Sequence, residues 1–140
     1  MTRRTFFGVA AAAAVPSSTD IQIDEITPSY TDYNYRAPYQ FGGKQVDRVT
    51  MLNVHCRVHT RSGKSATGFA SMSLGNIWSF PASNIPYDVT LNAMKALAGK
   101  IARLTGNFHD YAHPLDINRT LLPEYLNAAS GISRELNLAV

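Results

Sequence analysis

Cysteine is nearly absent from the 140-residue chain, which contains only Cys56. A single thiol cannot close a disulfide within the chain, so burial of apolar surface must hold the fold together. The composition, 45% hydrophobic and 16% charged, excludes an intrinsically disordered chain. About 120 residues remain if a targeting segment is removed, which is enough for one domain with its own core.

A large excess of charge is also missing. The formal net charge is +3, and it falls to +1 without Arg3 and Arg4, since 11 Lys and Arg then stand against 10 Asp and Glu. Nucleic-acid binding requires cations clustered on one face, whereas the remaining cations are interleaved with apolar and neutral residues. We therefore expect no nucleic-acid partner.

No apolar run is long enough to cross a membrane. Residues 6–15 supply ten, against about 20 for a transmembrane helix, so we expect no permanent membrane anchor. The run follows Arg3-Arg4, begins with Phe6-Phe7 and is rich in alanine. This pattern resembles a twin-arginine export signal. We interpret residues 1–18 as such a signal, cleaved near Ala14, and expect a periplasmic or exported protein. A frayed alanine-rich helix is the alternative.

Residues 19–140 contain the pattern of a single domain. Ile21 and Ile23 share a face and predict a strand over residues 20–27, which Pro28 ends. Residues 30–43 contain five aromatic residues, a proline and two terminal glycines, with neither helical nor strand periodicity. This composition predicts a long loop.

A hairpin and two helices follow. Apolar and polar side chains alternate over residues 49–59, and a glycine turn then leads to a second strand over residues 66–74. After an irregular stretch, helical spacing from Leu91 to Leu104 predicts a helix that Asp88 or Thr90 can cap and Gly106 can end. A last helix is predicted over residues 122–138, with Pro123 in its first turn. The fold class is therefore α+β, a small antiparallel three-stranded sheet followed by helices.

In this order the chain resembles the N-terminal capping domain of the mandelate racemase and muconate lactonizing enzymes, in the enolase superfamily. The resemblance covers residues 20–140. It is carried by the first strand, the Arg36-Ala37-Pro38 segment, the long strand before the glycine turn, the Gly68-Phe69 strand and the helices after Pro86. The chain departs from the pattern at Ala70-Ser71-Met72, where many members carry a glutamate.

The resemblance implies the function of a larger enzyme. In the family a (β/α)-barrel holds Mg²⁺ through acidic residues, and a Lys or His removes the proton α to a carboxylate. We interpret residues 19–140 as the capping domain of a racemase, acid-sugar dehydratase or cycloisomerase, which is an isomerase or lyase. We expect a fragment that ends at or before the start of the barrel, with no catalytic residue and no metal site of its own. Its expected partners are its own barrel domain, a carboxylate substrate and further copies in a homo-oligomer.

The aromatic segment implies substrate contacts, because in the family this loop covers the mouth of the barrel and contributes to substrate selection. Its side chains offer hydroxyls, stacking surfaces and cations for a carboxylate. The candidate substrate-binding residues are Tyr33, Tyr35, Arg36, Tyr39 and Lys44. Arg36 is the residue we expect to contact the anionic group. Loop tyrosines equally pack on a domain's own surface or at an interface. The alternative function is an exported, non-catalytic module that binds a glycan or a protein partner.

Other candidate chemistry has a structural explanation. His55 and His59 lie about 13 Å apart along one strand face, too far for one zinc ion, so we interpret them as solvent-side or sheet-packing histidines. Residues 109–113 offer three potential ligands, fewer than the usual four. Cys56 lies on the apolar face of its strand, which indicates a buried structural thiol.

Overall fold

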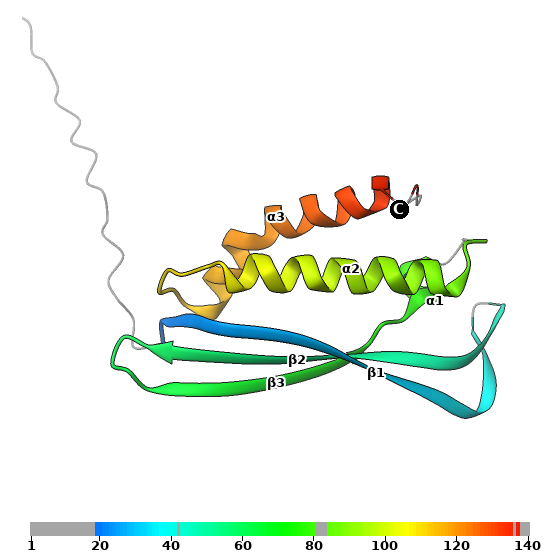
Figure 1. Ribbon diagram of the computed structural model, residues 1–140, viewed down its shortest axis with the longest axis horizontal. Helices are drawn as coiled ribbons and strands as arrows, with labels where there is room; N and C mark the ends of the chain where they lie inside the picture. Colours follow the sequence, from blue (N-terminus) through cyan, green and yellow to red (C-terminus); the bar gives the residue numbers. More distant parts are fainter. Residues whose placement is uncertain (1–18, 42, 81–83, 136, 138–140) are drawn as a thin grey trace, which may run out of the picture.

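The computed structural model describes residues 19–41, 43–80, 84–135 and 137. A three-stranded antiparallel sheet followed by helices confirms the predicted α+β class. The elements are β1 (Ile21–Phe41), β2 (Lys44–Thr60), β3 (Ser65–Ser73), α1 (Asn76–Ser79), α2 (Tyr87–Gly106) and α3 (Pro114–Glu135). Figure 1 shows the helices as one layer on one face of the sheet.

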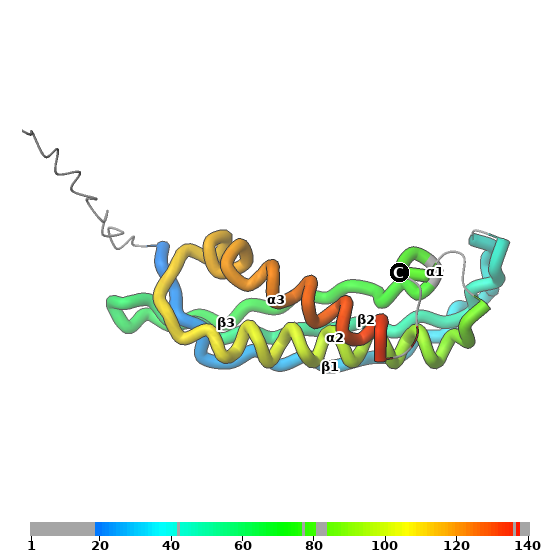
Figure 2. Tube along the Cα trace, turned by 90° about the horizontal axis from the view of Figure 1, so that it is seen from above, coloured from blue at the N-terminus to red at the C-terminus, as the bar shows by residue number. Residues whose placement is uncertain are grey.

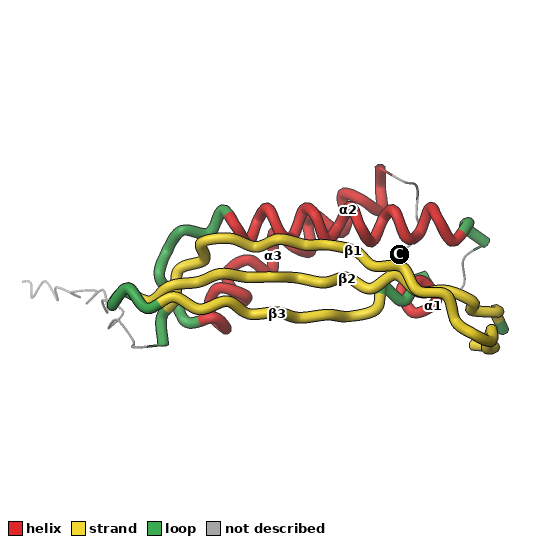
Figure 3. Tube along the Cα trace, turned by 60° about the horizontal axis from the view of Figure 1, so that its bottom comes forward, coloured by secondary structure: helices red, strands yellow, loops and turns green. Residues whose placement is uncertain are grey.

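The β2 and β3 strands form the predicted hairpin, with β2 beginning five residues earlier than expected, at Lys44. Gly63 occupies the turn with φ +81°, a conformation that favours glycine, and its N–H donates to the Thr60 carbonyl at 2.9 Å. Within the described residues the strand order β1-β2-β3 leaves β1 and β3 at the edges of the sheet, as Figure 3 shows.

The predicted long loop at residues 30–43 is wrong, because β1 continues through it to Phe41. Every residue from 31 to 41 is exposed, so neither face is buried and the alternation that marks a strand is missing. Pairing with β2 forms the strand instead, with Tyr30 opposite Leu52 and Phe41 opposite Lys44. The register skips residues 35–38, which bulge from the ladder.

Pro28 does not end the first strand, contrary to the prediction. It lies inside β1, opposite Val54 of β2. An edge strand tolerates proline because the missing backbone N–H can face away from the neighbouring strand. The outcome therefore depends on the position of β1 in the sheet, which the local sequence does not show.

The predicted helix after Pro86 is confirmed as α2, but its predicted cap is wrong. The N-cap residue is Pro86, and the described residues supply no side-chain cap. The Thr90 hydroxyl instead donates to the Tyr87 carbonyl at 2.8 Å, while the charge of Asp88 in the first turn suits the helix dipole. The helix ends at Gly106, as predicted. The irregular stretch before α2 contains the one-turn helix α1.

The last helix, α3, begins at Pro114, eight residues before its predicted start. Pro123 therefore lies inside the helix rather than in its first turn. It cannot bond the carbonyl of Arg119, but both residues are exposed, so water can bond that carbonyl. The first helical position is occupied by Pro114, where a missing N–H costs nothing.

The core lies between the sheet and the helices. One cluster joins Ile23 of β1 to Ile117 and Leu121 of α3, with half-buried side chains of β2 packed against it. A second cluster joins Ala93 of α2 to Ile132 of α3. Figure 2 shows from above that α2 follows β1, whereas β3 lies on the far side of the sheet. The helix α2 thus lies along the β1 edge, whereas α3 crosses the layer obliquely.

Candidate functional site

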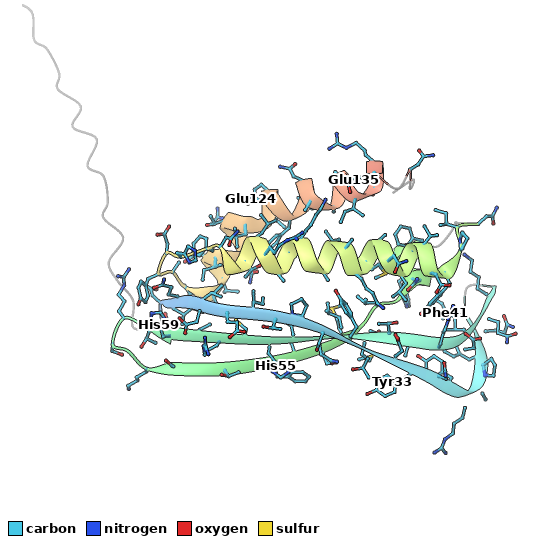
Figure 4. All side chains as sticks on the ribbon, in the orientation of Figure 1. Tyr33, Phe41, His55, His59, Glu124 and Glu135 are labelled. Atoms are coloured by element: carbon cyan, nitrogen blue, oxygen red, sulfur yellow. The ribbon has the colours of Figure 1, made fainter. Side chains whose placement is uncertain are left out.

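The end of the β1–β2 hairpin, residues 31–41 and 44–49, is the hairpin tip. Gly43, with φ +75°, turns the chain there. Several aromatic side chains of the tip are exposed, among them Tyr33 at 56% and Tyr39 at 46%. Figure 4 shows Tyr33 on the face away from the helices and Phe41 on the helix side. The two faces of the tip therefore offer different surroundings to a ligand.

A cavity of about 240 Å³ lies where the tip meets the segment between β3 and α2. Aromatic rings form much of its wall: the Tyr35 and Tyr39 centroids lie 5.3 Å apart, edge to face, and those of Phe41 and Trp78 lie 4.8 Å apart. Pockets for drug-sized ligands measure about 300–1,000 Å³. This cavity therefore suits a small ligand or one end of a larger one.

Two cations, Lys44 and Arg48, line the same cavity. The Arg48 guanidinium lies 4.4 Å above the Tyr87 ring, and its Nη2 is 3.3 Å from Oδ1 of Asp88. The side chains of this ion pair are 49% and 74% exposed, so the pair contributes little to stability. A ligand carboxylate can therefore replace Asp88 at Arg48 at small cost.

Asn76, the first residue of α1, lines the cavity and is only 7% exposed. Its Nδ2 donates to the Tyr87 carbonyl at 3.0 Å and to the Thr90 hydroxyl at 2.6 Å. Turning the amide over would set its oxygen against that carbonyl, which fixes the orientation. The Asn76 Oδ1 has no hydrogen-bond partner in the part of the chain that the structure describes. This oxygen is buried from solvent, so its missing hydrogen bond is an unfavourable feature inside the fold.

Two tyrosine hydroxyls at the cavity are neutral at physiological pH. Desolvation raises the pKa of Tyr87 above its usual 10.0, and this outweighs the lowering by a hydrogen bond with Thr50 and by Arg48. Desolvation also raises the pKa of Tyr35, assisted by the neighbouring Tyr39. Both hydroxyls therefore serve as hydrogen-bonding groups rather than as bases.

A second, more polar cavity of about 370 Å³ shares Arg48 and Tyr87 with the first. Asp32 of β1 and Thr50 of β2 contribute to its lining, and the Thr50 hydroxyl donates to the Asp32 carboxylate. A substitution at Arg48 or Tyr87 therefore alters both cavities.

The structure brings together three of the five predicted substrate-binding residues, since Tyr35, Tyr39 and Lys44 line the first cavity. Tyr33 and Arg36 are not among its described lining residues. Tyr33 lies on the opposite face (Figure 4), and Arg36 lies in the exposed bulge of residues 35–38. Substrate binding by these five residues stays a prediction.

Sequence reasoning missed Arg48, Asn76 and Tyr87 as cavity residues. Arg48 precedes the residue at which the strand was predicted to begin, and an earlier start would have included it. Asn76 and Tyr87 lie in the stretch that was predicted to be irregular. Their meeting depends on the path of the chain from β3 to α2, for which the sequence offers no signal.

A separate polar cluster lies at the opposite end of the sheet. His59 has its Nδ1 2.7 Å from Asp24 Oδ1 and its Nε2 2.6 Å from the Tyr111 hydroxyl. A neutral ring with its proton on Nδ1 donates to Asp24 and accepts from Tyr111. His55 stacks on Phe69, with the ring centroids 4.8 Å apart. Both histidines thus contact other side chains, as sheet-packing histidines do.

The described residues contain no group of three or more His, Cys, Asp or Glu side chains that could hold a metal ion. The oxygen-rich ligand set that Mg²⁺ requires is therefore not found in these ranges. Nor is any described helix both long and apolar enough to span a membrane. The segment interpreted as an export signal, residues 1–18, lies outside the described residues.

Comparison with known proteins gives two similar solved structures. No protein-family model matches the chain, and no curated protein matches it. The first structure is a dipeptide epimerase from Enterococcus faecalis V583, complexed with Mg and the dipeptide L-Leu-L-Tyr, at 9% identity and a TM-score of 0.41 over 81% of this chain and 26% of that one. The second is L-talarate/galactarate dehydratase from Salmonella typhimurium LT2, at 15% identity and a TM-score of 0.41 over 89% of this chain and 28% of that one. The chain thus spans about a quarter of the length of each.

Proposed function

We propose that the chain is a capping domain that selects the substrate of an enzyme of the enolase superfamily, of the mandelate racemase and muconate lactonizing type. Such an enzyme removes the proton α to a carboxylate. Two features support the proposal: the sequence resemblance over residues 20–140 and the α+β architecture of a three-stranded sheet followed by helices. The cavity at the hairpin tip is the observation that carries it.

The cavity has the chemistry of a carboxylate site. Arg48 presents a planar guanidinium that can bind a carboxylate through two hydrogen bonds, and Lys44 adds a second cation. Aromatic rings beside these cations can pack against the apolar part of a ligand.

The proposal assigns the reaction itself to a barrel domain. Mg²⁺ and the catalytic base would belong to that barrel, as the family resemblance implies, and the described residues of this chain contain no group of three potential metal ligands. We propose that residues 1–18 direct export to the periplasm and that the complete enzyme is a homo-oligomer.

Two arginines of the hairpin provide the test. Arg48 lines the cavity, whereas Arg36 lies in the exposed bulge outside it. Benzoate and galactarate, with benzamide as the uncharged control, can be titrated into the 140-residue chain while backbone amide shifts of the tip are followed by NMR. We expect saturable shifts with the carboxylates in the wild type and in Arg36→Ala, and their loss in Arg48→Ala. Equal responses to benzoate and benzamide, or unchanged binding in Arg48→Ala, would reject the carboxylate site.

The role predicted for Arg36 concerns the complete enzyme. If Arg36 contacts the anionic substrate across the interface with the barrel, Arg36→Ala should lower kcat/KM there while carboxylate binding to the 140-residue chain stays unchanged. If neither kcat nor KM moves and the fold is intact, Arg36 has only a structural role.

A second candidate function has its own supporting observation. Trp78 is 75% exposed and packs on Phe41, and an exposed aromatic surface of this kind can stack on the apolar face of a sugar. An exported glycan-binding module would respond to neutral oligosaccharides and lose that response in Trp78→Ala. The carboxylate site predicts no such response.

A further inference from the structure

The β3 strand is a sheet edge without the features that usually prevent edge pairing. Its nine residues, Ser65–Ser73, include no proline and no charged residue, and all nine are exposed. Natural edge strands are protected by charges, prolines, bulges or a covering element. Figures 2 and 3 show α2 on the β1 side of the sheet, away from β3.

The opposite edge, β1, has several of these features. It contains Asp24, Glu25 and Pro28, and its register is broken by bulges after Ile23 and after Asn34. Its start is also paired, because Ile21 exchanges backbone hydrogen bonds of 3.0 and 3.1 Å with Ala112. Of the two edges in the described structure, β3 is therefore the open one.

About its central residue, Phe69, the sequence of β3 places residues of compatible size and polarity at matching positions in the two directions. A two-fold axis through an antiparallel pair of identical strands sets matching positions opposite one another. The positions brought together are Gly68 with Ala70, Thr67 with Ser71, Ala66 with Met72, and Ser65 with Ser73. In these cross-strand pairs small residues lie opposite small residues and hydroxyl groups lie opposite hydroxyl groups. The long side chain of Met72 lies opposite an alanine.

We propose that the chain forms a two-fold symmetric dimer through antiparallel pairing of β3 with β3 of a second copy, centred on Phe69. The pairing would join the two three-stranded sheets into one. The absence of charge matters most for a second copy, because any charged residue at the centre of the pair would face its own like charge. A partner strand of different sequence would not require compatible residues at matching positions about Phe69.

Side chains on the face away from the helices fit this arrangement. Phe69 is 60% exposed and stacks on His55, which Figure 4 places on that face. In the dimer the two Phe69 rings are opposite one another, where an aromatic pair stabilises a sheet. A row of hydrogen bonds already runs across the sheet, from the Ser71 hydroxyl to Asn53 Oδ1 at 2.6 Å and from Asn53 Nδ2 to the Thr31 hydroxyl at 3.1 Å. Thr67 of the second copy would extend this row from Ser71.

The side chains of β3 that face the helix layer are also exposed. Met72 is 62% exposed and, with Leu74 and side chains of α2 and α3, lines an apolar groove of about 400 Å³. Pairing with the small Ala66 of the second copy leaves room for the Met72 side chain. The dimer therefore removes exposed apolar surface on both faces of the edge.

Charge substitutions at the two-fold centre test the proposal on the full 140-residue chain. Sedimentation equilibrium should show a concentration-dependent dimer for the wild type. Phe69→Lys alone and Phe69→Glu alone should each raise the dimer Kd by about tenfold or more, because like charges then meet at the centre. An equimolar mixture of the two variants should restore the dimer, since opposite charges are then paired. Far-UV circular dichroism checks that each variant keeps its fold.

Disulfide trapping tests the register independently of affinity. In a Cys56→Ala background, Phe69→Cys places two thiols opposite one another at the axis, within reach of a disulfide. Thr27→Cys is the matched control, because Thr27 lies in the same cross-strand row through His55 but at the β1 edge. We expect mild oxidation to crosslink the Phe69→Cys variant and not the Thr27→Cys variant.

Three results would overturn the proposal. The wild type could be monomeric at every accessible concentration, the charged variants could remain dimeric, or both cysteine variants could crosslink equally. Equal crosslinking would indicate random collision. A monomer would indicate that this edge pairs with another polypeptide or stays open.

Discussion

The two ends of the β1–β2 hairpin share one backbone ladder but differ in what lies behind them. At the end near the start of β1, Ile23 is only 6% exposed and packs on Ile117 and Leu121 of α3. At the hairpin tip, residues 31–41 are all exposed, and in Figure 1 the end of β1 curves away from the helix layer. The pairing of β1 with β2 therefore extends from a packed core to a two-stranded tip whose β1 residues are all exposed.

The two ends therefore have different roles: the helix-backed end stabilises the fold, and the tip offers side chains for binding. Burial of apolar surface is the main favourable term in folding, so the helix-backed end should hold most of the free energy of the fold. The tip contributes little burial, and its aromatic and cationic side chains remain available to a ligand.

The largest expected effect is a core truncation. Leu121→Ala removes a side chain that is 5% exposed and should lower the free energy of unfolding by about 2–5 kcal/mol. Tyr39→Ala, at a tip residue that is 46% exposed, should lower it by about 0.5 kcal/mol or less. Urea unfolding followed by circular dichroism measures both. Similar losses would mean that the tip is as important to the fold as the core.

Hydrogen exchange should show the same division along one strand. Amides of residues 44–49 of β2 should exchange about a hundredfold faster than those of residues 52–58, because local opening at the tip exposes little apolar surface. NMR-detected exchange at low protein concentration, where the β3 edge is unpaired, gives both values in one sample. Uniform protection along β2 would contradict a separately opening tip.

Removal of a single hydroxyl tests the polar cluster of Asp24, His59 and Tyr111 at the helix-backed end. Tyr111→Phe leaves His59 Nε2 without its partner at 2.6 Å and should lower the free energy of unfolding by about 1 kcal/mol. Tyr33→Phe, which changes an exposed hydroxyl at the tip, is the matched control and should have no measurable effect. If the two variants are equally stable, the cluster contributes nothing to the difference between the ends.

The smallest expected effect is a pH dependence at Cys56. Desolvation, and secondly the Asp24 carboxylate, raise the pKa of this thiol above its usual 9.0. In the unfolded chain the thiol ionises at its ordinary pKa, so above that pH the folded state binds more protons, and the contribution of Cys56 to stability falls as pH rises past about 9. The stability difference between the wild type and Cys56→Ala should therefore shrink between pH 8 and pH 10. A constant difference would show that the thiol ionises alike in both states.

The amino-acid sequence by itself determined the α+β class, the β2–β3 hairpin and the helix that ends at Gly106. Of these elements, β2 and α2 each have one partly buried face, and burial of one face imposes a period of two on a strand and of 3.6 on a helix. Three of the predicted ligand-binding residues, Tyr35, Tyr39 and Lys44, also share one cavity. Residues 30–41 therefore contribute side chains to a cavity, although they were predicted to form part of a loop and instead continue β1 to Phe41.

Only the tertiary structure decided the features that lack such a period. Residues 31–41 form a strand because β2 lies beside them, Pro28 is tolerated because β1 is an edge, and α3 continues through Pro123 because that side of the helix faces water. The cavity depends on Asn76 and Tyr87 meeting Arg48 across more than 25 residues of sequence. Long-range contacts of this kind leave no local pattern, because the residues that make them are selected by their partners in space and not by their neighbours in the chain.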